Sequence, residues 1–104
     1  MSEAAARAAF VPGASGVYRL EAPLTFATVA ALRVPGLDLI GAAGRALSLD
    51  LASVPAVDSA GLALLIDWLA MARSHDCHLS YQQPAATLLA LARLSEVEPL
   101  LLGA

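Results

Sequence analysis

Residues 47–73 read LSLDLASVPAVDSAGLALLIDWLAMAR, and this stretch decides the fold. Its leucines first alternate with polar residues, which is the pattern of a half-buried strand. After a short loop, apolar residues recur at the spacing of a helix. Asp58 and Ser59 stand where this helix begins, and a helix N-terminus leaves amide N–H groups unsatisfied. The stretch therefore predicts a strand, a loop and a helix that displays a binding or regulatory residue.

The rest of the chain predicts further strands and helices in alternation. The predicted strands are residues 9–11, 17–20, 47–51 and 77–81, and the predicted helices are residues 25–32, 59–74 and 84–94. Thr25 is the expected N-cap of the first helix, and Pro35-Gly36 is expected to prevent helical structure from continuing beyond it. The Ala-rich start is expected to fray. This order predicts an α/β sandwich with partly parallel strands, in one domain of 104 residues.

The composition indicates a protein partner. Apolar residues make up 59% of the chain and charged residues 14%, against a typical charged share of about 25%. The best apolar run, residues 62–72, is shorter than the roughly 20 residues of a spanning helix and contains Asp67. The first residues carry Glu3 and lack the pattern of a signal peptide. We therefore expect a cytoplasmic protein whose apolar surface is covered by a partner, and the single Cys77 suits a reducing compartment.

Several functional classes are disfavoured by the sequence. The six basic residues are all scattered Arg in a chain of net charge −3, so neither a nucleic-acid patch nor a nucleotide-binding P-loop is expected. Ser74-His75-Asp76 contains the residue types of a catalytic triad, but consecutive side chains do not converge. His75, Cys77 and His78 with Asp76 resemble a metal cluster by composition only, since Cys77 and His78 would point to opposite faces of a strand that begins at Cys77. We predict no catalytic residue, no cofactor and no metal.

The helix predicted at residues 59–74 has three different faces. One apolar stripe, expected to lie on the sheet, contains Leu62, Leu65, Ile66 and Leu69. A second stripe, expected to pack under a neighbouring helix, contains Leu64, Trp68 and Met71. The remaining strip, which is small and weakly polar and is predicted to be a partner interface, contains Ser59, Ala63, Asp67, Ala70 and Ser74.

The start of this helix admits a structural and a functional interpretation. Asp and Ser are both preferred N-cap residues, so capping alone would explain one of Asp58 and Ser59. A cap can also be a recognition point, and the sequence leaves both roles open for each residue. Gly61 lowers helix stability relative to Ala, and close backbone packing is the simplest reason for it.

The loop pattern hydrophobic-Asp-Ser/Thr-small-Gly-Leu is matched by residues 57–62, VDSAGL. With the strand before it, this loop resembles the centre of a STAS domain, the fold of anti-sigma-factor antagonists and of MlaB-type subunits of bacterial phospholipid transporters. The resemblance covers nearly the whole chain and implies a mixed four-stranded sheet with helices packed against it. Residues 62–73 look more like the MlaB type. The departures are the Pro35-Gly36 break and the Leu-rich ending at residues 99–102.

The resemblance implies a function as well as a fold. It implies a non-catalytic cytoplasmic subunit bound to the ATPase of an ABC-type phospholipid transporter, held at the inner face of the inner membrane by that partner and without direct membrane insertion. The alternative is an anti-sigma-factor antagonist that a partner kinase phosphorylates, and the phosphorylated position of that family falls on Ser59. A small hydrolase, the third class, lacks a base near any nucleophile. The predicted partner-binding residues around Ser59 are Asp58, Ala60, Gly61, Ala63, Asp67 and Ala70.

Overall fold

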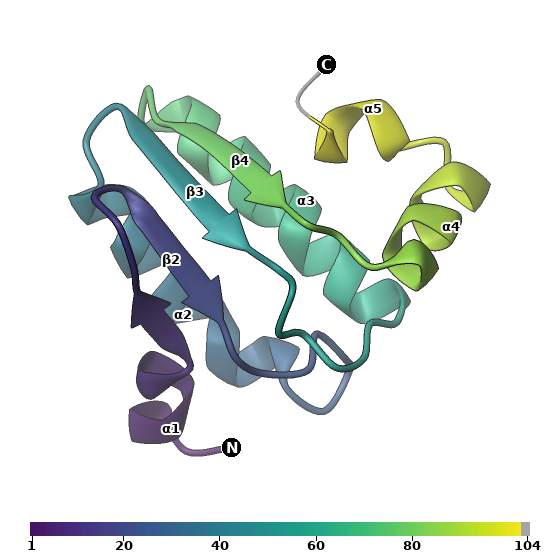
Figure 1. Cartoon of the computed structure of the whole chain (residues 1–104), viewed down its shortest axis with the longest axis horizontal. Coiled ribbons are helices and arrows are strands. Elements are labelled where there is room, and N and C mark those ends of the chain that lie inside the picture. Colours follow the sequence, from purple (N-terminus) through teal and green to yellow (C-terminus); the bar gives the residue numbers. More distant parts are fainter. Residues whose placement is uncertain (103–104) are drawn as a thin grey trace.

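The computed structural model describes residues 1–102 and contains four strands and five helices within them (Figure 1). In chain order the elements are α1 (Glu3–Ala8), β1 (Phe10–Pro12), β2 (Val17–Leu20), α2 (Val29–Ala42), β3 (Ala46–Asp50), α3 (Ser59–Ser74), β4 (His78–Gln82), α4 (Ala86–Leu94) and α5 (Glu98–Leu101).

The four strands form one mixed sheet in the order β1-β2-β3-β4. β1 and β2 are antiparallel, whereas β2 pairs with β3 and β3 pairs with β4 in parallel. Parallel neighbours need a crossover connection, and α2 and α3 supply the two crossovers on one face of the sheet (Figure 1). The predicted α/β class and the mixed four-stranded sheet are therefore confirmed.

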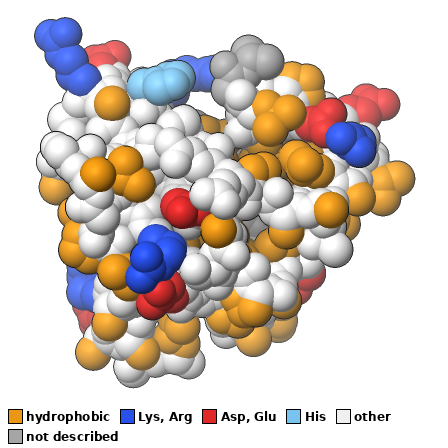
Figure 2. Space-filling model, viewed as in Figure 1, with side chains coloured by type: hydrophobic (Ala, Val, Ile, Leu, Met, Phe, Trp, Pro, Cys, Tyr) orange, Lys and Arg blue, Asp and Glu red, His pale blue; other side chains and the backbone are white. Residues whose placement is uncertain are grey.

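The two faces of the sheet differ as the period of the strands requires. Leu47, Leu49, Leu79 and Tyr81 are buried beneath the helices. On the opposite face, Ser48 and Ser80 lie side by side with their hydroxyl oxygens 3.0 Å apart. Figure 2, viewed toward this open face, has few hydrophobic side chains over the strands. The core of the domain thus lies between the sheet and the pair α2 and α3.

Trp68 is buried in that core, and it confirms for its own position the predicted packing of the second apolar stripe under a neighbouring helix. Its side chain is 1% exposed, and its indole N–H donates to the Arg33 carbonyl of α2 at 3.2 Å. The ring of Phe10 meets it edge-on, with 5.9 Å between ring centroids. A Cβ atom on Gly36 would overlap the indole, so the backbone of α2 lies directly on Trp68.

The helix predicted at residues 25–32 is wrong in position. Residues 25–28 form a turn, in which the N–H groups of Thr28 and Val29 both donate to the Thr25 carbonyl, at 2.9 and 3.0 Å. The helix begins at Val29 and runs to Ala42, through the expected break at Pro35. Proline costs a helix interior about 3 kcal/mol, but Pro35 and Gly36 are buried against α3, and this packing outweighs local propensity.

The Ala-rich start is a helix instead of a frayed end. The Ser2 hydroxyl caps α1 by accepting from the Ala5 N–H at 3.0 Å, and Ala6 is fully buried. Arg7 donates to Asp38 of α2 at 2.8 Å. Capping and docking on α2 together hold the six residues of α1, which the sequence pattern alone does not predict.

The first apolar stripe of α3 is only partly where it was expected. Leu62 and Leu65 are buried over the sheet, and the Tyr81 hydroxyl donates to the Leu65 carbonyl at 2.6 Å. Burial raises the pKa of this hydroxyl well above its usual range. Ile66 and Leu69 are half-buried and line a cavity beside α5. Ile66 and Leu69 therefore face α5 across this cavity, and are not fully covered by the sheet.

Candidate partner-binding site

The loop between β3 and α3 is fixed to the segment that precedes α2. Val57 forms a parallel bridge with Leu24. The Leu24 N–H donates to the Ala56 carbonyl at 2.9 Å, and the Asp58 N–H donates to the Leu24 carbonyl at 3.1 Å. These bonds hold the start of α3 against the turn at residues 25–28, so the two segments form one surface.

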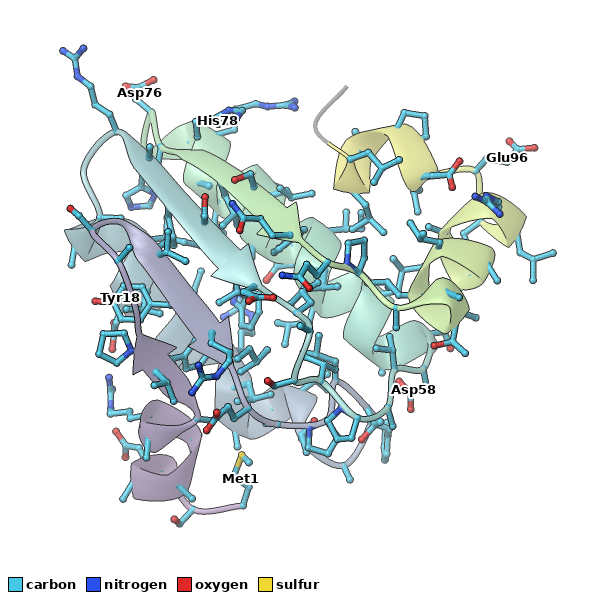
Figure 3. All side chains as sticks on the ribbon, viewed as in Figure 1. Met1, Tyr18, Asp58, Asp76, His78 and Glu96 are labelled. Atoms are coloured by element: carbon cyan, nitrogen blue, oxygen red, sulfur yellow. The ribbon has the colours of Figure 1, made fainter. Side chains whose placement is uncertain are left out.

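Asp58 caps α3 and also holds the neighbouring turn. Figure 3 labels Asp58 at the start of α3. Its carboxylate accepts from the Gly61 N–H at 3.1 Å and from the Phe26 N–H at 2.9 Å. These two bonds, the one from Phe26 first, lower the pKa of Asp58 below its ordinary value because they stabilise the charged form. Asp58 therefore fills the N-cap role that the sequence left open between two residues.

Ser59 is consequently free of the capping role. It is the first residue of α3 and is exposed. Among residues 1–102, no group forms a hydrogen bond with its hydroxyl. An exposed hydroxyl beside unsatisfied helix N–H groups is open to recognition or to modification.

Gly61 lies beneath this surface. It is buried, and a Cβ atom at this position would overlap the carbonyl of Leu24. The same carbonyl accepts from the Asp58 N–H, so the close approach at Gly61 is what lets the loop and the turn bond to each other. Close packing, the simplest reason offered by the sequence, is confirmed for Gly61.

The other predicted site residues lie along α3 at different depths. Ala63 and Ala70 are exposed, whereas Ala60 and Asp67 are half-buried. Asp67 accepts from the Arg33 guanidinium of α2 at 3.2 Å, and both side chains remain partly exposed. The small strip of α3 is therefore brought together with the outer side of α2 through an ion pair.

Phe26 is a candidate site residue that sequence reasoning missed. Its side chain is 84% exposed, although its N–H is bound by Asp58, the residue that precedes Ser59. Phe26 is the single large apolar residue between Thr25 and Thr28, which is a signal in the sequence. It was missed because residues 25–32 were predicted to be a helix, and not a turn that exposes this side chain. We use the name docking surface for Phe26, Ser59, Ala63, Asp67 and Ala70.

The polar residues at the C-terminal end of α3 form hydrogen bonds with its last turn. The Ser74 hydroxyl donates to the Met71 carbonyl at 2.8 Å, and His75 Nδ1 lies 2.8 Å from the same oxygen. Asp76 follows in the left-handed region with φ of 54°. In the described part of the chain, no group of three or more His, Cys, Asp or Glu side chains is arranged to hold a metal ion.

A known family matches this fold and this site. The family model described as "Mlab, STAS domain" matches residues 11–103, which include all of β2, β3 and β4, most of β1 and the whole docking surface. The chain belongs to this MlaB-type STAS family. No curated protein matches the chain.

STAS domains of this type have an accessory role and are typically non-catalytic. In this STAS domain Ser59 is exposed at the start of α3, Asp58 and Ala60 beside it are half-buried, and Gly61 is buried. None of the helices within residues 1–102 is long and apolar enough to cross a membrane.

Proposed function

We propose that this STAS domain is a non-catalytic cytoplasmic subunit that binds the ATPase of an ABC-type phospholipid transporter and stabilises or regulates it. The observation that carries the proposal is that Asp58 and Ser59, which are adjacent, have different structural roles. Asp58 caps α3 and secures the turn, and Ser59 keeps an exposed hydroxyl at the helix start. Membership of the MlaB-type family supports the choice of partner.

The chemistry of the docking surface suits a protein partner. Exposed Ala63 and Ala70 allow another backbone to approach α3 closely. Phe26 provides a large apolar side chain beside that strip, and aromatic residues are enriched in protein interfaces relative to the rest of the surface. The one charged residue of the surface, Asp67, is already paired with Arg33, so docking leaves no isolated carboxylate without a cation. ATP hydrolysis belongs to the partner, which brings this domain to the inner face of the membrane.

The second candidate is an anti-sigma-factor antagonist regulated by phosphorylation of Ser59. It is favoured by the exposure of a hydroxyl that takes no part in holding the fold. A phosphate there would add roughly −1.5 to −2 charges at a helix start, beside the carboxylate of Asp58. In either function the free Ser59 hydroxyl is the recognition point, and the partner differs.

Identification of the bound protein distinguishes the two. The tagged chain is expressed in its own host, cross-linked in living cells and purified, and the attached proteins are identified by mass spectrometry. The proposal predicts an ABC transporter ATPase, captured by the wild-type chain and not by Ala63→Trp. Capture of an anti-sigma-factor kinase in its place would establish the second candidate, and capture of neither would contradict both.

A further inference from the structure

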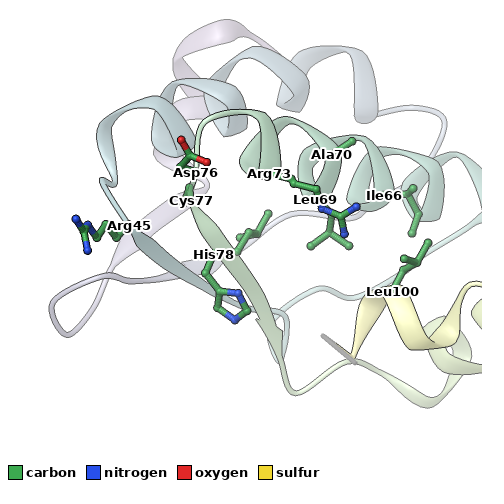
Figure 4. A pocket seen from close by; sticks show the side chains of 10 residues that line it. Arg45, Ile66, Leu69, Ala70, Arg73, Asp76, Cys77, His78 and Leu100 are labelled. Carbon is green, nitrogen blue, oxygen red and sulfur yellow. The ribbon is translucent and has the colours of Figure 1, made fainter.

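A cavity of about 470 Å³ lies at the opposite end of α3 from Ser59 (Figure 4). It is open to solvent on one side and is bordered by the C-terminal half of α3, the start of β4 and the short helix α5. Arg73, at its mouth, is about 20 Å along the helix from Ser59, at about 1.5 Å per residue. The cavity is therefore far from Ser59, and it adjoins the docking surface only at Ala70, which belongs to both.

Five of the ten residues that line the cavity are aliphatic. α3 contributes Ile66 and Leu69, β4 contributes Leu79 and α5 contributes Leu100. Leu100 is 46% exposed, and Ile66 and Leu69 are only half-buried. Figure 2 shows hydrophobic side chains gathered over α4 and α5, on the side of the molecule that contains this cavity. Apolar walls that remain in contact with water favour an apolar occupant.

The cavity also carries unpaired positive charge. Of the six arginines, Arg7, Arg19, Arg33 and Arg93 form ion pairs with carboxylates. The other two, Arg45 and Arg73, form none within residues 1–102, and both line the cavity.

These charges are not evenly placed. In Figure 4 the guanidinium of Arg73 lies over Leu69, toward Leu100, and His78 projects from β4 on the other side. The guanidinium of Arg45 points away at the far end, and Asp76, the carboxylate of the lining, lies at that end too. The positive charge over the aliphatic walls therefore comes from Arg73. The imidazole of His78 lies on the other side of the cavity as a second group able to form hydrogen bonds.

We propose that this cavity binds an anionic amphiphile, with a phosphate or carboxylate head group on Arg73 and a short hydrocarbon chain between Ile66, Leu69, Leu79 and Leu100. Its volume falls in the range of about 300–1,000 Å³ that is common for small-molecule sites. A guanidinium is well suited to the planar or tetrahedral oxygens of such a head group. The proposal does not depend on the identity of the protein partner.

The test is an NMR titration of the isotope-labelled full chain with octyl phosphate, below the concentration at which it forms micelles. The expected result is saturable shifts of the amides of residues 66–79 and 100, with a Kd of about 1 mM or lower. Octyl glucoside has the same chain without the charge, and inorganic phosphate has the charge without the chain. Each is expected to bind at least about tenfold more weakly, because each lacks one half of the interaction.

Two variants locate the head group and the chain. Arg73→Gln is expected to weaken octyl phosphate binding about tenfold or more, and Leu100→Gln is expected to weaken it as well. Arg19→Gln is the matched control, because Arg19 lies on β2 and is paired with Glu21. Absence of saturable shifts, equal binding of octyl glucoside, or unchanged binding in Arg73→Gln would each overturn the proposal.

Discussion

The carboxylate of Asp58 accepts a hydrogen bond from the backbone N–H of Phe26 at 2.9 Å, across 32 positions of sequence. The same carboxylate accepts from the Gly61 N–H and so caps α3. One side chain thus fixes the turn before α2 to the first turn of α3. The consequence for function is that Phe26 and Ser59 are presented on a shared rigid base, while neither side chain is used to build it.

The ionisation of Asp58 makes part of the stability depend on pH. Its pKa is lower in the folded state, so the charged carboxylate contributes stability that is complete above its unfolded pKa of about 4 and is lost as the pH falls through the folded pKa. We expect Asp58→Asn to melt a few degrees below wild type at pH 7. That gap should shrink below about pH 4, as thermal melts followed by circular dichroism would reveal. A gap that stays constant down to pH 2.5 would contradict the assigned role of the carboxylate.

Two glycines of α2 are expected to respond oppositely to the same substitution. Gly36→Ala places a methyl group in the Trp68 indole and should destabilise the domain by about 1–3 kcal/mol. Gly41→Ala meets no atom within 4 Å and should stabilise it by about 0.4–1 kcal/mol, because Ala restricts the unfolded chain. Urea unfolding of both variants measures the difference. Equal effects of the two substitutions would be inconsistent with direct packing of α2 on Trp68.

Phe26 is expected to contribute to binding and not to folding. Its side chain is 84% exposed, so Phe26→Ala should leave the melting temperature nearly unchanged. Loss of an aromatic anchor at an interface should weaken the complex with the ATPase by about tenfold or more. Leu94→Ala is the matched control, because Leu94 is also 84% exposed but lies on α4. If both variants bind alike in calorimetric titration, Phe26 is not part of the interface.

Negative charge at Ser59 is expected to separate binding from stability. A carboxylate in the first turn is favoured by the helix dipole and opposed by Asp58, so Ser59→Glu should change stability by less than about 1 kcal/mol. It should weaken the complex, because the added charge must be desolvated without a waiting cation. Ser59→Ala should change stability by less than about 0.5 kcal/mol, since the hydroxyl caps nothing.

The control for Ser59→Glu is the same change at Ser15, which is exposed in the turn between β1 and β2. Melting temperature and pull-down of the partner are measured for all three variants. Full binding by Ser59→Glu would remove Ser59 from the interface, and unfolding of Ser59→Ala would assign it a structural role.

Much of this architecture could be predicted because the strands and α3 have clear hydrophobic periods. α3 begins at Ser59 and ends at Ser74 as predicted, since Asp58 is a strong capping residue and the apolar spacing is regular. The predicted start of α2 was wrong because Thr25 and Thr28 are both suitable N-cap residues. The choice between them depends on the bond from the Thr28 hydroxyl to the Pro23 carbonyl and on the bond from the Phe26 N–H to Asp58.

What sequence patterns could not predict depends on contacts between distant residues. Pro35 reads locally as a helix breaker, but α2 runs through it, with Pro35 and Gly36 buried and the backbone of Gly36 directly on Trp68. The cavity depends on where α5 lies relative to Leu69, which no local pattern fixes. The exposure of Phe26 depends on the bond between its N–H and Asp58. Candidate site residues on α3 could therefore be predicted, whereas their neighbour on the turn could not.

The central claim is that the small strip of α3 docks on the transporter ATPase. Its most direct test is the affinity of the purified chain for that ATPase, measured for Ala63→Trp and for Ala90→Trp. Both alanines are exposed on helices, but Ala90 lies on α4, outside the docking surface. The account predicts that both variants fold and that only Ala63→Trp loses binding, by about a hundredfold or more, because a bulky side chain prevents close approach of the two backbones. Wild-type affinity of Ala63→Trp would contradict the account.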